Sequence, residues 1–179
     1  MRLGGWKARA PYKDAMSPKV LAVIEATLGT LGSDPDPECW IVWGEDPAAR
    51  YLLLVPTSAG LLQVHARVNV PGEGPRASAK LIRWSRVQIG ELAVEHTGGH
   101  RIVSFQVEGQ VLHATDDDAA EVAAFALRLF AAIDGHPYVP PTEPKRTARP
   151  TTTGAKAATG AKAPKTPPAA ARRSVSRGT

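Results

Sequence analysis

The chain has 179 residues and a single cysteine, Cys39. This length suits one folded domain with a tail, because a single hydrophobic core commonly takes about 100 to 150 residues. One cysteine excludes an intrachain disulfide and, with it, a disulfide-framed secreted domain. No run approaches the roughly 18 apolar residues that span a bilayer, and the basic N-terminus lacks the apolar stretch of a secretory signal. We therefore expect a soluble, cytoplasmic protein without a membrane span.

Charge is divided unequally along the chain. Residues 1–144 hold all seventeen acidic residues and thirteen of the twenty-two Lys and Arg, a net charge of −4. Residues 145–179 hold the other nine cations and no acid, a net charge of +9. The overall net charge of +5 therefore reflects the C-terminal tail and not the surface of the folded part.

A polar segment, residues 1–16, precedes the first helical pattern, residues 17–32. Ser17 is a candidate N-cap, Pro18 suits the first helical position, and Gly32 suits the end. Between them the residues at helical spacing form one broad apolar face. They are Val20, Leu21, Val23, Ile24, Thr27, Leu28 and Leu31.

From Cys39 to about Thr115 the pattern changes to period two, with turn signals every eight to twelve residues. The clearest strand is "LLQVHARVNV", in which valines and Ala66 alternate with His65, Arg67 and Asn69. We predict about seven short antiparallel strands. They are "CWIVW", "YLLLVP", "LLQVHARVNV", "SAKLIRW", "VQIGELAVEH", "RIVSFQV" and "QVLHAT". In "CWIVW", Trp40 and Trp43 lie three positions apart, so we expect opposite faces and one of them in the core.

The last predicted element is an amphipathic helix, "TDDDAAEVAAFALRLFAAIDG". Thr115 and Asp118 form a capping-box pattern, the aspartates suit a helix N-terminus, and Gly135 suits its end. The three aspartates could also bind a divalent cation, but a helix start explains them better. Six apolar residues form a seam at helical spacing. They are Val122, Phe125, Ala126, Leu129, Phe130 and Ile133.

These patterns predict an α+β fold with one domain over residues 17–135. A proline-rich linker, 136–150, follows it, and then a basic low-complexity tail, 151–179. The tail repeats "TGAKA" at 153–157 and 159–163, and residues 145–179 have one Val as their only large apolar side chain. Such a segment cannot bury enough surface to offset about 1–2 kcal/mol of backbone entropy per residue, so we expect it to be disordered.

The loop "PGEGPRASAK", 71–80, contains glycines and cations that also occur in phosphate-binding loops. A phosphate loop needs a helix whose N-terminus faces the anion, whereas Lys80 is followed by a strand pattern. We therefore predict a wide hairpin loop, with anion contact through Arg76 and Lys80 as the alternative.

The stretch around this loop, 65–86, has five cations and one acid. If the strand pattern continues, Lys80, Trp84 and Arg86 share one face, and a basic face with an aromatic residue can bind anions or single-stranded nucleic acid. A solvated face with one tucked Trp is the alternative. Our candidate polyanion-binding residues in the body are therefore Arg76, Lys80, Trp84 and Arg86.

Neither a metal site nor an active site is predicted. His96 and His100 flank a turn, but no paired Cys motif or H-E-x-x-H helix accompanies them, so we expect surface histidines. No nucleophile elbow, no kinase or Rossmann glycine signature and no carboxylate pair in a pocket context is present. We predict no catalytic residue, no metal and no cofactor.

Seven antiparallel strands closed by an amphipathic helix resemble the arrangement of pleckstrin-homology-like domains, over roughly 39–135. "RIVSFQVEGQVLHAT" followed by "TDDDAAEVAAFALRLFAAIDG" carries this resemblance. It implies binding of phosphoinositides, peptides or partner proteins, commonly through a basic loop.

The tail segment "TGAKAATGAKAPKTPPAAARR" resembles, in composition, the Ala-, Lys- and Pro-rich tails of histone H1-like and bacterial HU-like chromosome proteins. The resemblance implies nonspecific contact with nucleic acid or another polyanion. The tail cations that we assign to such contact are Lys156, Lys162, Lys165, Arg172, Arg173 and Arg177.

The sequence therefore predicts a non-enzymatic binding or adaptor module with a protein partner that it does not identify and a basic tail. The alternative is a small-molecule-binding or catalytic domain whose residues form no local motif. An enclosed pocket lined by polar groups would favour the alternative, and a filled core would favour the module.

Overall fold

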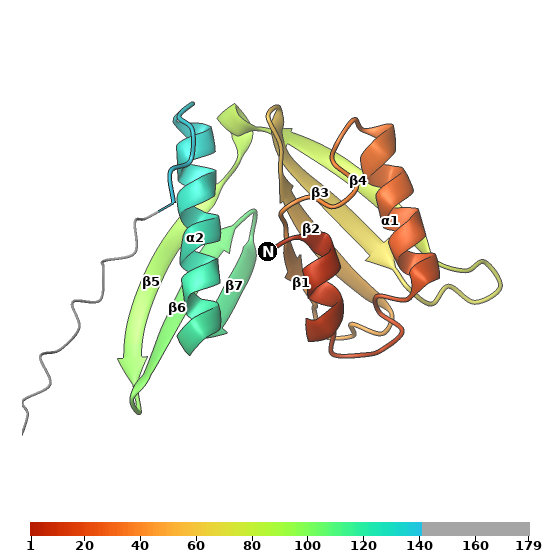
Figure 1. Cartoon of the computed structure of the whole chain (residues 1–179), viewed down its shortest axis with the longest axis horizontal. Coiled ribbons are helices and arrows are strands. Elements are labelled where there is room, and N and C mark those ends of the chain that lie inside the picture. Colours follow the sequence, from red (N-terminus) through yellow and green to blue (C-terminus); the bar gives the residue numbers. More distant parts are fainter. Residues whose placement is uncertain (141–179) are drawn as a thin grey trace, which may run out of the picture. The chain divides into compact units, whose positions relative to one another are not determined.

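The computed structural model describes residues 1–140, which form two antiparallel sheets with helices packed on them (Figure 1). The first sheet has the strand order β1-β2-β3-β4 and the second has the order β5-β6-β7. The helical elements are the 3-10 helices η1 (Leu3–Arg9) and η2 (Trp84–Arg86) and the α-helices α1 (Pro18–Thr30) and α2 (Asp116–Ile133). The strands are β1 (Trp40–Val42), β2 (Arg50–Pro56), β3 (Gly60–Arg67), β4 (Arg76–Arg83), β5 (Ile89–Thr97), β6 (His100–Val107) and β7 (Gln110–Thr115). The α+β prediction with seven antiparallel strands is confirmed.

Tight turns set the register of the second sheet. Glu108 and Gly109 connect β6 to β7, and both have positive φ, 51° and 73°. Positive φ at both central residues is the requirement of the two-residue hairpin turn that matches strand twist. Val107 consequently pairs with Gln110, and Phe105 with Leu112.

Helix α1 covers the first sheet through Val20, Ile24 and Leu28, which are buried as predicted. Gly32, with φ of 69°, ends it, because the N–H of Ser33 reaches back to the carbonyl of Leu28 and that of Gly32 to Gly29. Two details differ from the prediction. The Ser17 side chain makes no capping hydrogen bond, and Leu31 is exposed because it lies at the C-cap, beyond the packed face.

Helix α2 covers β6 and β7 (Figure 1). Its buried residues confirm the predicted seam at four of six positions. Phe130 is partly buried against Phe105, and Ile133 is exposed in the last turn. The predicted capping box is wrong, because the Thr115 side chain makes no capping bond and Asp118 instead pairs with Arg9 at 2.8 Å. The buried residues are Ala119, Val122, Phe125, Ala126 and Leu129.

Residues 1–16, which the sequence patterns set apart from the domain, contribute to its core. Leu3, Trp6, Ala15 and Met16 are buried. Arg2 forms a β-bridge with Glu38, just before β1, and this pairing brings η1 against the first sheet. Residues of this segment are therefore part of the hydrophobic core together with those of 17–135.

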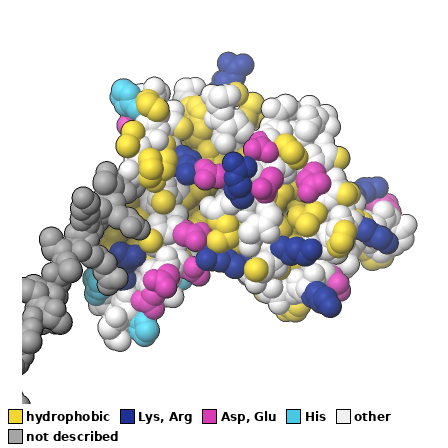
Figure 2. Space-filling model, in the orientation of Figure 1, with side chains coloured by type: hydrophobic (Ala, Val, Ile, Leu, Met, Phe, Trp, Pro, Cys, Tyr) yellow, Lys and Arg dark blue, Asp and Glu magenta, His cyan; other side chains and the backbone are white. Residues whose placement is uncertain are grey.

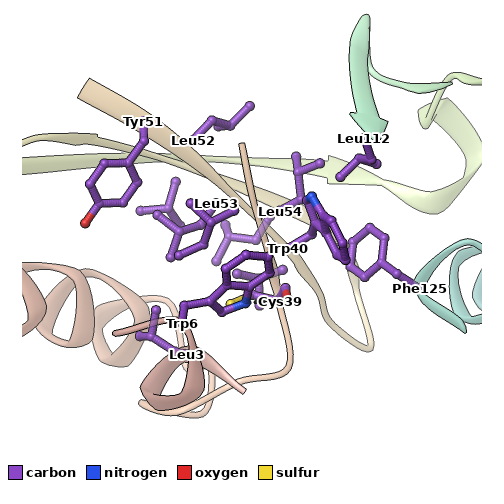
Figure 3. Close-up of a cluster of buried hydrophobic side chains, with 14 of the residues drawn as sticks. Leu3, Trp6, Cys39, Trp40, Tyr51, Leu52, Leu53, Leu54, Leu112 and Phe125 are labelled. Atoms are coloured by element: carbon purple, nitrogen blue, oxygen red, sulfur yellow. Dashed lines mark hydrogen bonds between the residues drawn. The ribbon is translucent and has the colours of Figure 1, made fainter. Parts of the chain in front are cut away.

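One continuous apolar core extends from η1 and the first sheet to α2. Trp40 lies in it between Trp6, at a ring distance of 5.1 Å, and Phe125, at 6.1 Å. Figure 3 shows Leu112 of β7 in the same cluster. Within residues 1–140, no polar or charged residue is buried in this core, and no helix is long and apolar enough to cross a membrane.

Candidate anion-binding groove

Three arginines stand side by side across the first sheet. Arg50 of β2 is the direct partner of Arg67 of β3, and Arg67 is the direct partner of Arg76 of β4. Direct partners in an antiparallel sheet point to the same face, with Cα atoms about 4.5–5.5 Å apart. We call Arg50, Arg67 and Arg76 the arginine row, and it crosses about 10 Å of sheet.

The arginine row forms one end of an open groove of about 670 Å³. The next row of the same face contributes Leu52, His65 and Ser78, and Gln110 of β7 lies at the side. No Asp or Glu is among the residues that line this groove. The groove therefore combines guanidinium and neutral hydrogen-bonding groups over a partly apolar floor.

Few carboxylates balance the arginine row. Glu73 of the β3–β4 loop pairs with Arg76 at 2.8 Å. Within residues 1–140, Arg50 and Arg67 take part in no ion pair. By contrast, basic and acidic side chains are interspersed on the face in Figure 2. The row is thus a local excess of positive charge on a body of net negative charge.

The structure separates the four candidate residues that the sequence placed in the body. The predicted hairpin is confirmed, and it places Arg76 in the arginine row. Lys80 lies on the same face but opposite Gln63, two rows away. The predicted continuation of the strand through Trp84 and Arg86 is wrong, because β4 ends at Arg83 and the 3-10 helix η2 follows.

The Trp84 side chain is held by a contact within the domain and does not offer a free ring on which a base could stack. Its indole N–H donates to the carbonyl of Thr57 at 3.1 Å, and the side chain is half-buried. The alternation that suggested a shared face holds only while the backbone stays extended, so the change to a 3-10 helix removes it. The six candidate residues of the tail lie outside the described residues.

Sequence analysis did not assign Arg50 to the site. Arg50 ends the polar string "GEDPAAR" and is the first residue of β2, so its pattern resembles a loop. Its neighbour in the row, Arg67, lies seventeen positions later. A register prediction for the β2–β3 hairpin would have brought the two together, since "PTSAG" marks the turn between the strands.

The other chemical candidates have structural roles. His100 contacts Asp116 with its Nδ1 at 2.7 Å, and this hydrogen bond holds the pKa of the Asp116 carboxyl below its ordinary value.

Among the residues that the structure describes, no three His, Cys, Asp or Glu side chains gather as metal ligands. Burial raises the pKa of the Cys39 thiol to about 12, so this thiol stays protonated at neutral pH. The three aspartates at 116–118 are the start of α2, as predicted.

Comparisons with protein-family models, curated proteins and solved structures found no match to this chain. The resemblance to pleckstrin-homology-like domains stays a prediction.

Proposed function

We propose that this protein is a non-enzymatic binding module that contacts the phosphates of nucleic acid through the arginine row and the basic tail. The observation that carries the proposal is the alignment of Arg50, Arg67 and Arg76 on neighbouring strands. Like charges directly opposite one another destabilise a sheet, and a bound polyanion relieves that repulsion.

The chemistry of arginine suits phosphate. The planar guanidinium donates two parallel hydrogen bonds to phosphate oxygens, and its charge is independent of pH in the physiological range. Phosphate contacts set affinity without reading base sequence. The module should therefore bind nucleic acids of unrelated sequence with similar affinity.

The apolar core supports the part of the proposal that the module is non-enzymatic. The buried cluster of residues 1–140 is apolar throughout, and the groove beside the arginine row is open to solvent. Catalytic acid–base pairs depend on titratable groups in a protected pocket. The titratable side chains that line the groove are His65, which is exposed, and Tyr51, whose hydroxyl donates to the carbonyl of Ala15 at 2.7 Å.

The test is the salt dependence of binding to labelled DNA duplexes of two unrelated sequences. The variant Arg50→Gln/Arg67→Gln removes two row charges, and Arg83→Gln/Arg86→Gln removes two exposed charges outside the row. Loss of two phosphate contacts should lower the slope of log K against log salt by about 1.8. We expect this change for the row variant and a much smaller one for the control.

A third variant replaces the six tail residues Lys156, Lys162, Lys165, Arg172, Arg173 and Arg177 by Gln in the full chain. It measures the contribution of the tail separately from that of the row. Equal slopes for the wild type and Arg50→Gln/Arg67→Gln would remove the row from the proposal. Absence of binding by the wild type at low salt would refute nucleic-acid contact altogether.

A further inference from the structure

A second groove lies between the two sheets. Strands β1 and β7 are each the last strand of their sheet and pair on one side only. Figure 1 shows these two strands at the facing borders of the sheets. A groove of about 420 Å³ is lined by residues 40–43 and 111–114, together with Trp6, Arg9 and Asp118. The lining includes all three residues of β1, with Trp43 after it, and four consecutive residues of β7, so side chains of both parities and the strand edges border the groove.

The hydrogen bonds of the residues just before β1 indicate which backbone groups of this strand point into the groove. The N–H of Cys39 donates to the carbonyl of Met1 at 2.9 Å, and the N–H of Leu3 donates to the carbonyl of Pro37 at 3.0 Å. Residues 37 and 39 thus direct their backbone groups away from β2. In an antiparallel pair this direction alternates, so the N–H and C=O of Ile41 point to the same free edge.

The same reasoning applies to β7. In a two-residue hairpin the residues that flank the turn form a hydrogen-bonded pair, here Val107 and Gln110. Alternate residues of β7 therefore bond to β6, and the backbone groups of Val111 and His113 point to the free edge. The free edge groups are therefore the N–H and C=O of Ile41 on β1 and those of Val111 and His113 on β7, because the backbone groups of Cys39 already bond to Met1 and Trp6.

We propose that this groove binds an extended, uncharged and apolar peptide segment of a partner protein, which adds as a strand between β1 and β7. An extended backbone is the ligand that can pair with both edges, and such addition would join the two sheets into one. β1 has three residues, so the inserted strand pairs over about 10 Å.

The chain itself provides a precedent at the same edge. Met1–Leu3 lie antiparallel to residues 37–39 through the Arg2–Glu38 bridge, one step before β1. The chain then turns into η1, where the Trp6 indole donates to the carbonyl of Cys39 at 3.1 Å. The N-terminal segment occupies the first part of the edge, and the proposed peptide continues along the rest.

The charge of the groove selects the kind of peptide. Its two charged residues, Arg9 and Asp118, are paired with each other at 2.8 Å. Trp6 and Trp40, which are mostly buried, and the half-buried Trp43 are also among its lining residues. A neutral peptide with large apolar side chains matches these walls, whereas a polyanion matches the arginine row.

The test uses the full chain and a random seven-residue peptide display library. Selected peptides are synthesised, and binding is measured by tryptophan fluorescence. We expect apolar sequences whose N-methylation at alternate residues weakens binding about tenfold, because each methyl group removes a backbone donor. Slower amide exchange at Ile41 and His113 should accompany binding of the unmodified peptide.

Matched variants test the β7 edge. Val111 is exposed, and its N–H points away from β6, so Val111→Pro removes an edge donor without breaking the ladder. Val111→Ala keeps that donor. We expect Val111→Pro to weaken binding about tenfold and Val111→Ala to leave it within about twofold. Equal binding by the two variants, no effect of N-methylation, or failure to select any peptide would overturn the proposal, as would self-association of the chain through this edge.

Discussion

Helix α2 permits a stringent test of the packing that closes the domain. Leu127 and Leu129 are the same residue type two positions apart in one helix, but Leu129 is fully buried whereas Leu127 is 42% exposed. Leu129→Ala removes a buried side chain worth about 1.5–3 kcal/mol in transfer free energy and leaves a cavity. Its loss of unfolding free energy should be about 3 kcal/mol, within the 2–5 kcal/mol that such changes usually cost.

The control, Leu127→Ala, should cost less than about 1 kcal/mol, because a partly exposed side chain leaves no closed cavity. Urea unfolding followed by circular dichroism measures both, with the slope m checked to confirm that the unfolded states are comparable. Equal losses at the two positions would show that α2 does not pack on β6 and β7 through the face described here.

Three further perturbations follow from individual contacts. A Cβ at Gly60 would collide with the backbone of Ile82 and Arg83 on β4, so Gly60→Ala should destabilise the protein by about 1–3 kcal/mol in the same urea assay; a neutral substitution would mean that the β3–β4 register is wrong. Cys39 should resist a thiol reagent at pH 8 in the folded protein and react in urea, because its pKa is raised by burial to about 12; rapid labelling without denaturant would contradict its burial. The pKa of Asp116 is lower in the folded than in the unfolded protein, so its carboxylate stabilises the fold above about pH 4 and loses this effect as the pH falls through the folded pKa. Asp116→Asn, which tolerates the φ of 53°, should therefore reduce stability at pH 6 and have a smaller effect at pH 3; a pH-independent difference would refute the role of the His100 contact.

Most of the fold could be predicted because its elements have local signals. The apolar spacing in α1 and α2 and the alternation around His65 and Arg67 depend only on residues close in sequence. The terminal glycines Gly32 and Gly135 have positive φ as expected. Propensity and periodicity act over a few residues, and these elements agree with them.

The remaining features depend on partners far apart in sequence. Trp6 is buried by contacts with Cys39 and Trp40, more than thirty positions away, and a seven-residue 3-10 helix is too short to show a period. Likewise, the arginine row depends on the register of three strands, which no local pattern contains. The candidate site was therefore predicted at Arg76 and in part at Lys80, but not at Arg50.

The links between η1 and α2 have a consequence for synthesis on the ribosome. Arg9 pairs with Asp118 and Glu121, and Trp40 packs against Phe125, so the earliest and latest elements of the domain complete one another. The chain grows at about 5–20 residues per second, so roughly 4–14 seconds separate the appearance of Leu54 from that of Phe125. During this interval Trp40 can pack against Trp6 but lacks its contact with Phe125, so the apolar core around it is incomplete. The nascent chain is therefore most prone to aggregation after its first sheet has formed and before its last helix is made.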